Sequence, residues 1–165
     1  MPVHSSLYFL IAALVLGFVA GMRSMMPLAA LSITLWRHPE IAPVNSPAHW
    51  FTLRALEIIF VLAALGELIG DKLPRTPNRT ALGPFVGRIA SGSLTGAALV
   101  QLGGVDPWTG AACGAIGAVA STFGMFHARR LVGRVTGIRD PYVGAMEDVI
   151  AIALVVIVIA TLLAA

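Results

Sequence analysis

A long apolar run near the N-terminus sets the strongest limit on the fold. Leu7 to Trp36 is a stretch of thirty mostly apolar residues. As one straight helix it would be about 45 Å long, whereas the hydrocarbon core of a bilayer is about 30 Å thick. Gly21, Arg23 and Pro27 lie near its middle, where a helix kinks or breaks. The run therefore predicts a first membrane helix that is broken around Arg23.

The rest of the chain has the same apolar character. Of its 165 residues, 58% are hydrophobic and 12% are charged, whereas soluble domains carry about 25% charged residues. Four further helices are predicted, at Phe51 to Leu73, Val86 to Leu102, Trp108 to about Leu131, and Pro141 to Ala165. The predicted fold is all-α: a polytopic membrane bundle of about five transmembrane helices, forming a single domain over residues 1–165.

The basic residues predict the orientation of the bundle. Eight of the 11 Lys and Arg residues lie in or beside the second-to-third and fourth-to-fifth connections, which the positive-inside rule places in the cytoplasm. Trp36, Trp50 and Trp108 then lie at the outer interface. If the first run crosses once, the N-terminus is inside and the C-terminus is outside. If it turns back at Arg23, the N-terminus is outside as well.

Small residues recur at helical spacing and predict close contact between helices. Ala13, Gly17 and Gly21 share one face of the first run, and Gly92 and Gly96 form a GxxxG pair in the third helix. The fourth helix carries a stripe that consists of Gly110, Gly114, Gly117, Ser121, Gly124 and Ala128. We expect this stripe to be the most tightly packed seam of the bundle. In so small a protein, such seams also predict a homo-oligomer.

Two segments of the chain resemble each other. The segment from Gly66 to Gly87 and the segment from Gly124 to Gly144 each contain the end of a helix, a basic connection, a proline, an aromatic residue and a new helix. Their offset is 57 or 58 residues. Because both units keep the same orientation, they predict a parallel two-helix repeat.

Acidic residues inside the predicted helices are the main candidates for function, because an ionisable group is costly in a membrane span. Glu67 and Asp71 are four residues apart and share a helix face. Glu147 and Asp148 lie about 10 Å from Pro141 along the last helix, a depth similar to that of Glu67 from Pro74. Clustered carboxylates can bind a cation or relay protons. The candidate binding residues are Glu67, Asp71, Glu147 and Asp148, with Arg23 and Arg88 as charge partners.

Two other interpretations of these charges remain open. Arg23, Arg88, Arg129 and Arg130 can each pair with an acid, and such ion pairs can simply fix helix register. The arginines could instead bind an anionic substrate. We expect no enzyme, since no nucleophile–base pair or phosphate-binding loop is recognisable. No nucleic-acid-binding motif is present. The sequence leaves the identity of any metal or cofactor unknown.

Three segments together resemble a known family. They are Gly21-Met22-Arg23-Ser24 with Pro27, Glu67 with Asp71-Lys72-Leu73-Pro74, and Gly144-Ala145-Met146-Glu147-Asp148. These segments resemble a bacterial membrane family that is catalogued as a domain of unknown function, number 4126. The resemblance implies a compact helical membrane domain in the bacterial inner (plasma) membrane and implies no activity.

The sequence thus supports two functional hypotheses. The first is a small transporter or permease-like protein, coupled to a cation or a proton through the intramembrane carboxylates. The alternative is a non-transporting membrane scaffold whose buried charges form ion pairs. The expected partners are the lipid bilayer, a small ion or proton, and further copies of the chain.

Overall fold

The computed structural model describes residues 5–70, 82–136 and 140–164. These ranges form seven α-helices and no β-strand, which confirms the all-α prediction. The helices are α1 (Ser6–Met22), α2 (Met26–Arg37), α3 (Pro47–Trp50), α4 (Arg54–Gly70), α5 (Leu82–Gln101), α6 (Pro107–Thr136) and α7 (Asp140–Leu163), with a short 3₁₀ helix at Pro39–Ile41. Within the described residues, two helical segments are long and apolar enough to cross a membrane, at Pro107–Val135 and Tyr142–Leu163.

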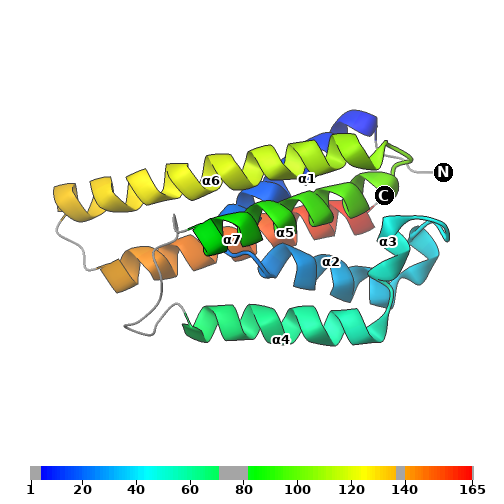
Figure 1. Ribbon diagram of the computed structural model, residues 1–165, viewed down its shortest axis with the longest axis horizontal. Helices are drawn as coiled ribbons and strands as arrows, with labels where there is room; N and C mark the ends of the chain where they lie inside the picture. The colour runs from blue at the N-terminus through cyan, green and yellow to red at the C-terminus, as the bar shows by residue number, and fades with distance from the viewer. Residues whose placement is uncertain (1–4, 71–81, 137–139, 165) are drawn as a thin grey trace.

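The first apolar run is broken at Arg23, as predicted, and the chain turns back there. The ring of Phe9, early in α1, packs against Gly103, just beyond α5. The segment that follows α2 reaches the same end of the bundle, where Ala48 N donates to Gln101 Oε1 at 3.3 Å. Helices α1 and α2 therefore run in opposite directions and form a hairpin (Figure 1). Pro27, in the first turn of α2, favours a new helix start at this point.

The two ends of the chain lie at the same end of the bundle. Tyr8, near the start of α1, and Thr161, near the end of α7, have their hydroxyl oxygens 2.9 Å apart. Figure 1 shows both termini beside α3, opposite the end where α4 finishes and α5 starts. The tip of the α1–α2 hairpin points toward that opposite end.

Helix α6 packs most extensively against α1 and α5, and glycines line these contacts. Gly114 lies against Gly17 of α1 and Gly92 of α5, and Gly110 lies against Gly96. A Cβ atom at any of these positions would collide with the backbone or a side chain of the neighbouring helix. The predicted seam is therefore confirmed in the N-terminal half of α6. It ends after Ser121, because Gly124 has open space at its Cα and Ala128 is exposed.

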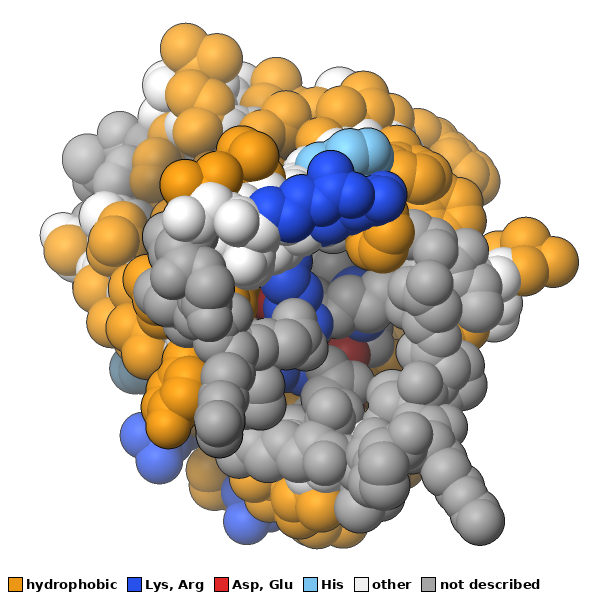
Figure 2. Space-filling model, turned by 90° about the vertical axis from the view of Figure 1, so that its left-hand side faces the viewer, with side chains coloured by type: hydrophobic (Ala, Val, Ile, Leu, Met, Phe, Trp, Pro, Cys, Tyr) orange, Lys and Arg blue, Asp and Glu red, His pale blue; other side chains and the backbone are white. Residues whose placement is uncertain are grey.

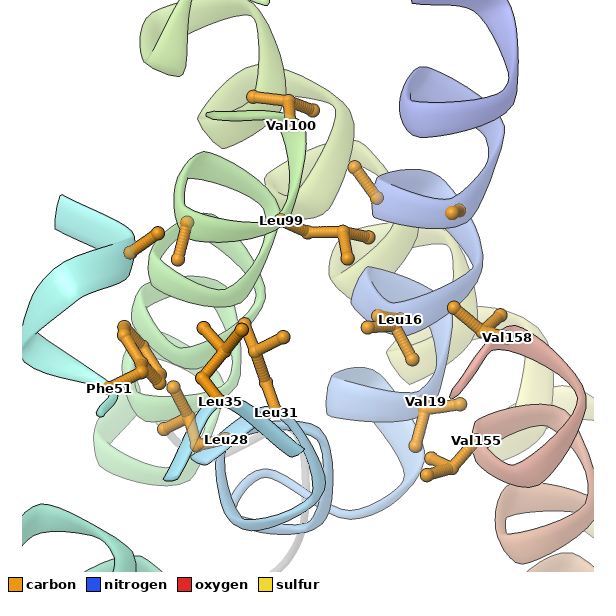
Figure 3. Close-up of a cluster of buried hydrophobic side chains, with 14 of the residues drawn as sticks. Leu16, Val19, Leu28, Leu31, Leu35, Phe51, Leu99, Val100, Val155 and Val158 are labelled. Atoms are coloured by element: carbon orange, nitrogen blue, oxygen red, sulfur yellow. The ribbon is translucent and has the colours of Figure 1, made fainter. Parts of the chain in front are cut away.

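The hydrophobic core lies around the α1–α2 hairpin (Figure 3). Leu28, Leu31 and Leu35 of α2 are buried near Phe51. On the other side of the core, Leu16 and Val19 of α1 face the C-terminal half of α7, where Val155 and Val158 are buried. The hairpin thus packs among the surrounding helices, with the side chain of Arg23 buried at its tip.

Helix α4 is the most peripheral of the long helices. None of its residues is buried, and its main contact is with α2. Ile58, Leu62, Leu65 and Ile69 are exposed along its outer face. Its attachment near the hairpin tip therefore depends on the polar contacts described below.

Candidate functional site

The tip of the α1–α2 hairpin is a short non-helical segment, Arg23 to Met25, in which Arg23 is buried and Ser24 and Met25 are half-buried. We call this segment the junction. A helix that ends leaves carbonyl groups without partners, and a helix that begins leaves N–H groups without partners. Both kinds of group occur at the junction, and in an apolar interior each needs a hydrogen-bond partner. Side chains from the neighbouring helices supply those partners.

Glu67 of α4 binds the N–H groups that precede α2. Its Oε1 accepts from Ser24 N at 2.8 Å and from Ser24 Oγ at 2.9 Å. Its Oε2 accepts from Met25 N at 2.9 Å. The carboxylate therefore caps the start of α2 from another helix, at the end where the helix dipole favours negative charge.

Asp148 of α7 forms an ion pair with Arg23 of the junction. Its Oδ1 lies 2.5 Å from both Nε and Nη2 of Arg23. The Arg23 side chain is 4% exposed and that of Asp148 is 15% exposed, so the pair is screened little by solvent. Because Arg23 is flanked by apolar helix on both sides, this pair neutralises a charge that would otherwise be costly to bury.

Helix α5 binds the carbonyl groups of the junction. Arg88 Nη1 donates to Gly21 O, the carbonyl near the end of α1, at 2.5 Å. Ser91 Oγ donates to Ser24 O. A cation near a helix C-terminus is also favoured by the helix dipole. Arg88 and Ser91 are one helical turn apart, so a single face of α5 serves both groups.

Glu147 lies beside Asp148 in sequence but has a different partner. It is 2% exposed, and its Oε2 is 3.6 Å from Nη2 of Arg129 on α6. Neighbouring residues on a helix point about 100° apart, which explains why the two acids face different helices. Asp71, the remaining predicted acid, lies outside the described residues.

The structure thus brings Glu67, Asp148, Arg23 and Arg88 to one junction, while Glu147 pairs with Arg129 nearby. Sequence reasoning missed the structural roles of Ser24, Ser91 and the Met25 backbone. The proline at position 27 was the available signal for these roles, because a helix that starts at Pro inside a buried run needs an acceptor for the preceding N–H groups.

The chemistry available at the junction is charge pairing and hydrogen bonding. Among the residues that the structure describes, no three His, Cys, Asp or Glu side chains are close enough to hold a metal ion. His127 is exposed on α6, where its Nδ1 donates to Phe123 O at 2.7 Å. Removal of the negative charge of Glu67 or Asp148 would alter the contacts of that side chain with the backbone or with Arg23.

The fold and this site define a class: an all-α bundle around a broken-helix hairpin whose junction is held by charged side chains of the enclosing helices. The chain belongs to the family described as a domain of unknown function, DUF4126, which matches residues 10–164. No curated protein and no solved structure matches the chain.

Proposed function

We propose that this protein is a small multi-pass transporter or permease-like protein of the bacterial plasma membrane, with the junction as its coupling centre. The single observation that carries the proposal is the break between α1 and α2, which packs among the helices, is bound by Glu67 and is paired through the buried Arg23 to Asp148. Non-helical backbone at membrane depth is tolerated only where it is buried in protein or lines a cavity. In many secondary transporters such discontinuous helices form the substrate and ion sites.

In the proposed topology, α4 to α7 cross the membrane and the α1–α2 hairpin enters from outside. Helix α2 has 12 residues, which correspond to about 18 Å, too short for a core of about 30 Å, and α1 forms a hairpin with it. This hairpin replaces the single crossing in the five-helix scheme. The basic connections 71–81 and 137–139 would lie in the cytoplasm and both termini outside. The parallel repeat of α4–α5 and α6–α7 stays a prediction.

Coupling to protons fits the junction better than coupling to a metal ion. Glu67 accepts three hydrogen bonds from Ser24 and Met25, and protonation of its carboxylate would weaken them. That would loosen α4, which has no buried residue, from the start of α2. The described carboxylates, in contrast, form no metal-binding group.

A flux assay tests the proposal. Purified protein is reconstituted in liposomes loaded with a pH-sensitive dye, and proton entry is followed under an imposed potassium diffusion potential. We expect flux above that of protein-free liposomes, lost in Glu67→Gln and retained in Glu57→Gln. Glu57 is a matched control on the same helix, 3.0 Å from Arg54 but without hydrogen-bond geometry. Flux in Glu67→Gln equal to that of the unmodified protein would refute a coupling role for Glu67.

The second candidate function is a membrane scaffold without transport. The observation in its favour is that Glu67, Asp148 and Glu147 all have partners within the chain. A scaffold predicts that Glu67→Gln and Glu147→Gln lower thermal stability, and that no cation or pH condition shifts the melting temperature of the unmodified protein. A thermal-shift screen over monovalent and divalent cations at several pH values separates the two functions.

Self-association remains part of the proposal. The glycine seam is used between helices of one chain, so it is not the proposed contact between copies. Helix α4 offers a continuous exposed apolar face instead. Light scattering of the purified protein in detergent, with the detergent contribution subtracted, gives the number of copies; a monomer at all concentrations would exclude a stable oligomer.

A further inference from the structure

The last turns of α6 carry a cationic surface that the junction does not use. His127, Arg130 and Arg134 are all exposed. Their spacing of three and four residues places them on one face of the helix. Arg129 points elsewhere, toward the buried Glu147. We call these three exposed residues the cationic face.

Apolar side chains lie beside the cationic face. Leu131 is 63% exposed and Val135 is 75% exposed. On an ideal helix Leu131 projects within about 100° of all three cationic residues, and Val135 projects within about 100° of His127 and Arg134. Figure 2 views the molecule onto this end and shows Lys or Arg side chains beside a histidine and hydrophobic side chains. A helix surface that combines cations with exposed apolar groups is typical of the membrane interface.

No described carboxylate neutralises this surface. Arg130 and Arg134 form no ion pair with an acid whose side chain the structure describes. Of those acids, Glu67, Glu147 and Asp148 lie toward this end of the bundle and are engaged at the junction or by Arg129. These carboxylates therefore leave the positive charge of the cationic face available to an anionic ligand.

The depth of the cationic face fits the headgroup layer. His127 lies about 30 Å along α6 from Pro107, which equals the thickness of the hydrocarbon core. Arg130 and Arg134 lie beyond it, at the level of lipid phosphates on the cytoplasmic side. The cytoplasmic leaflet carries anionic lipids that attract basic segments.

We propose that the cationic face of α6 binds the phosphate headgroups of anionic phospholipids, with Leu131 and Val135 against the upper acyl chains. This inference rests on the membrane location proposed above but is independent of transport. Anionic lipid would fix the inner end of α6, and through Arg129 and Glu147 the start of α7.

Lipid binding to the full chain tests the proposal. The protein is purified in a nonionic detergent, and bound lipid is measured by native mass spectrometry during titration with phosphatidylglycerol or phosphatidylcholine. We expect preferential binding of phosphatidylglycerol, weakened by salt. Arg130→Gln and Arg134→Gln should each lower the apparent affinity about fivefold, and the double variant about 25-fold, from the contribution of a basic residue near the surface. Arg37→Gln, an exposed arginine at the other end, is the matched control and should leave affinity unchanged.

Three results would overturn the proposal: equal binding of the two lipids, equal loss in Arg37→Gln, or binding of inorganic phosphate with the same dependence on Arg130 and Arg134. The last result would indicate a site for free anions. Reconstitution separates this inference from the membrane location: a protein that does not enter phosphatidylcholine nanodiscs refutes the location, whereas one that enters them without preferring phosphatidylglycerol refutes only the lipid site.

Discussion

Glu67 and Asp148 are both acids beside the junction, but they stabilise it in different ways. Glu67 accepts hydrogen bonds from backbone N–H groups, so it completes the secondary structure of another helix. Asp148 neutralises the buried guanidinium of Arg23. The first role requires an acceptor of the right shape, whereas the second requires a negative charge.

Replacement of Glu67 should reveal the capping role. Glu67→Ala leaves the N–H groups of Ser24 and Met25 without these acceptors in an apolar region, and we expect a loss of about 1–3 kcal/mol in unfolding free energy. Glu57→Ala breaks an ion pair with the half-exposed Arg54 and should cost at most about 1 kcal/mol. Unfolding by SDS in mixed micelles measures both. Equal losses would show that the Glu67 contacts add no stability.

A double-mutant cycle should reveal the charge role of Asp148. Arg23→Met leaves the Asp148 carboxylate without its guanidinium partner, and Asp148→Leu removes the carboxylate that faces Arg23; each should cost about 3–5 kcal/mol. The combined variant removes both charges and should be more stable than at least one of the single variants. The same unfolding assay measures the cycle. If the two single losses add in the double variant, the ion pair is not a coupled unit.

At the scale of elements, α6 organises the bundle because it allows α1 and α5 to approach its backbone. Gly114 contacts both neighbours, through Gly17 and Gly92. In a membrane such close approach replaces the hydrophobic driving force that acts in water. The C-terminal half of α6 lacks this packing and carries exposed cations instead, so one half of the helix is packed against its neighbours and the other half is exposed.

Alanine substitutions along α6 should separate these halves. Gly114→Ala places a Cβ against the Gly92 carbonyl and the Ser93 backbone N of α5, and overpacking of this kind should cost about 1–3 kcal/mol. Gly124→Ala meets open space and should be neutral or stabilise the helix by up to about 1 kcal/mol. Melting temperatures in one detergent compare the pair. A similar loss at both positions would contradict the seam.

At the scale of the whole molecule, the hairpin brings the N-terminus and the C-terminus to the same end of the bundle. Because α1 and α2 return to the same end, Tyr8 and Thr161 meet, and both termini lie at the end of the bundle that carries Trp36, Trp50 and Trp108.

Reporter fusions test this arrangement. An alkaline phosphatase domain after Ala165 should be active, because that enzyme folds only outside the cytoplasm, and an epitope at Met1 should be accessible to antibody in spheroplasts. A fluorescent protein inserted between Gly70 and Leu82 should fluoresce from the cytoplasm. Termini on opposite sides would contradict the hairpin and restore a single crossing by the first run.

The sequence by itself determined the features that depend on neighbouring residues. Pro27 marks the break because it lacks an N–H, the glycine spacing on α6 marks the packed face, and the apolar runs give the helices within a few residues. Only the tertiary structure decided that the run turns back and which charges meet. Arg23 and Asp148 are far apart in sequence, and their contact depends on how α7 is rotated against the hairpin. The same rotation of α7 turns Glu147 toward Arg129. Packing across several helices fixes this rotation, so no local pattern in the sequence reveals it.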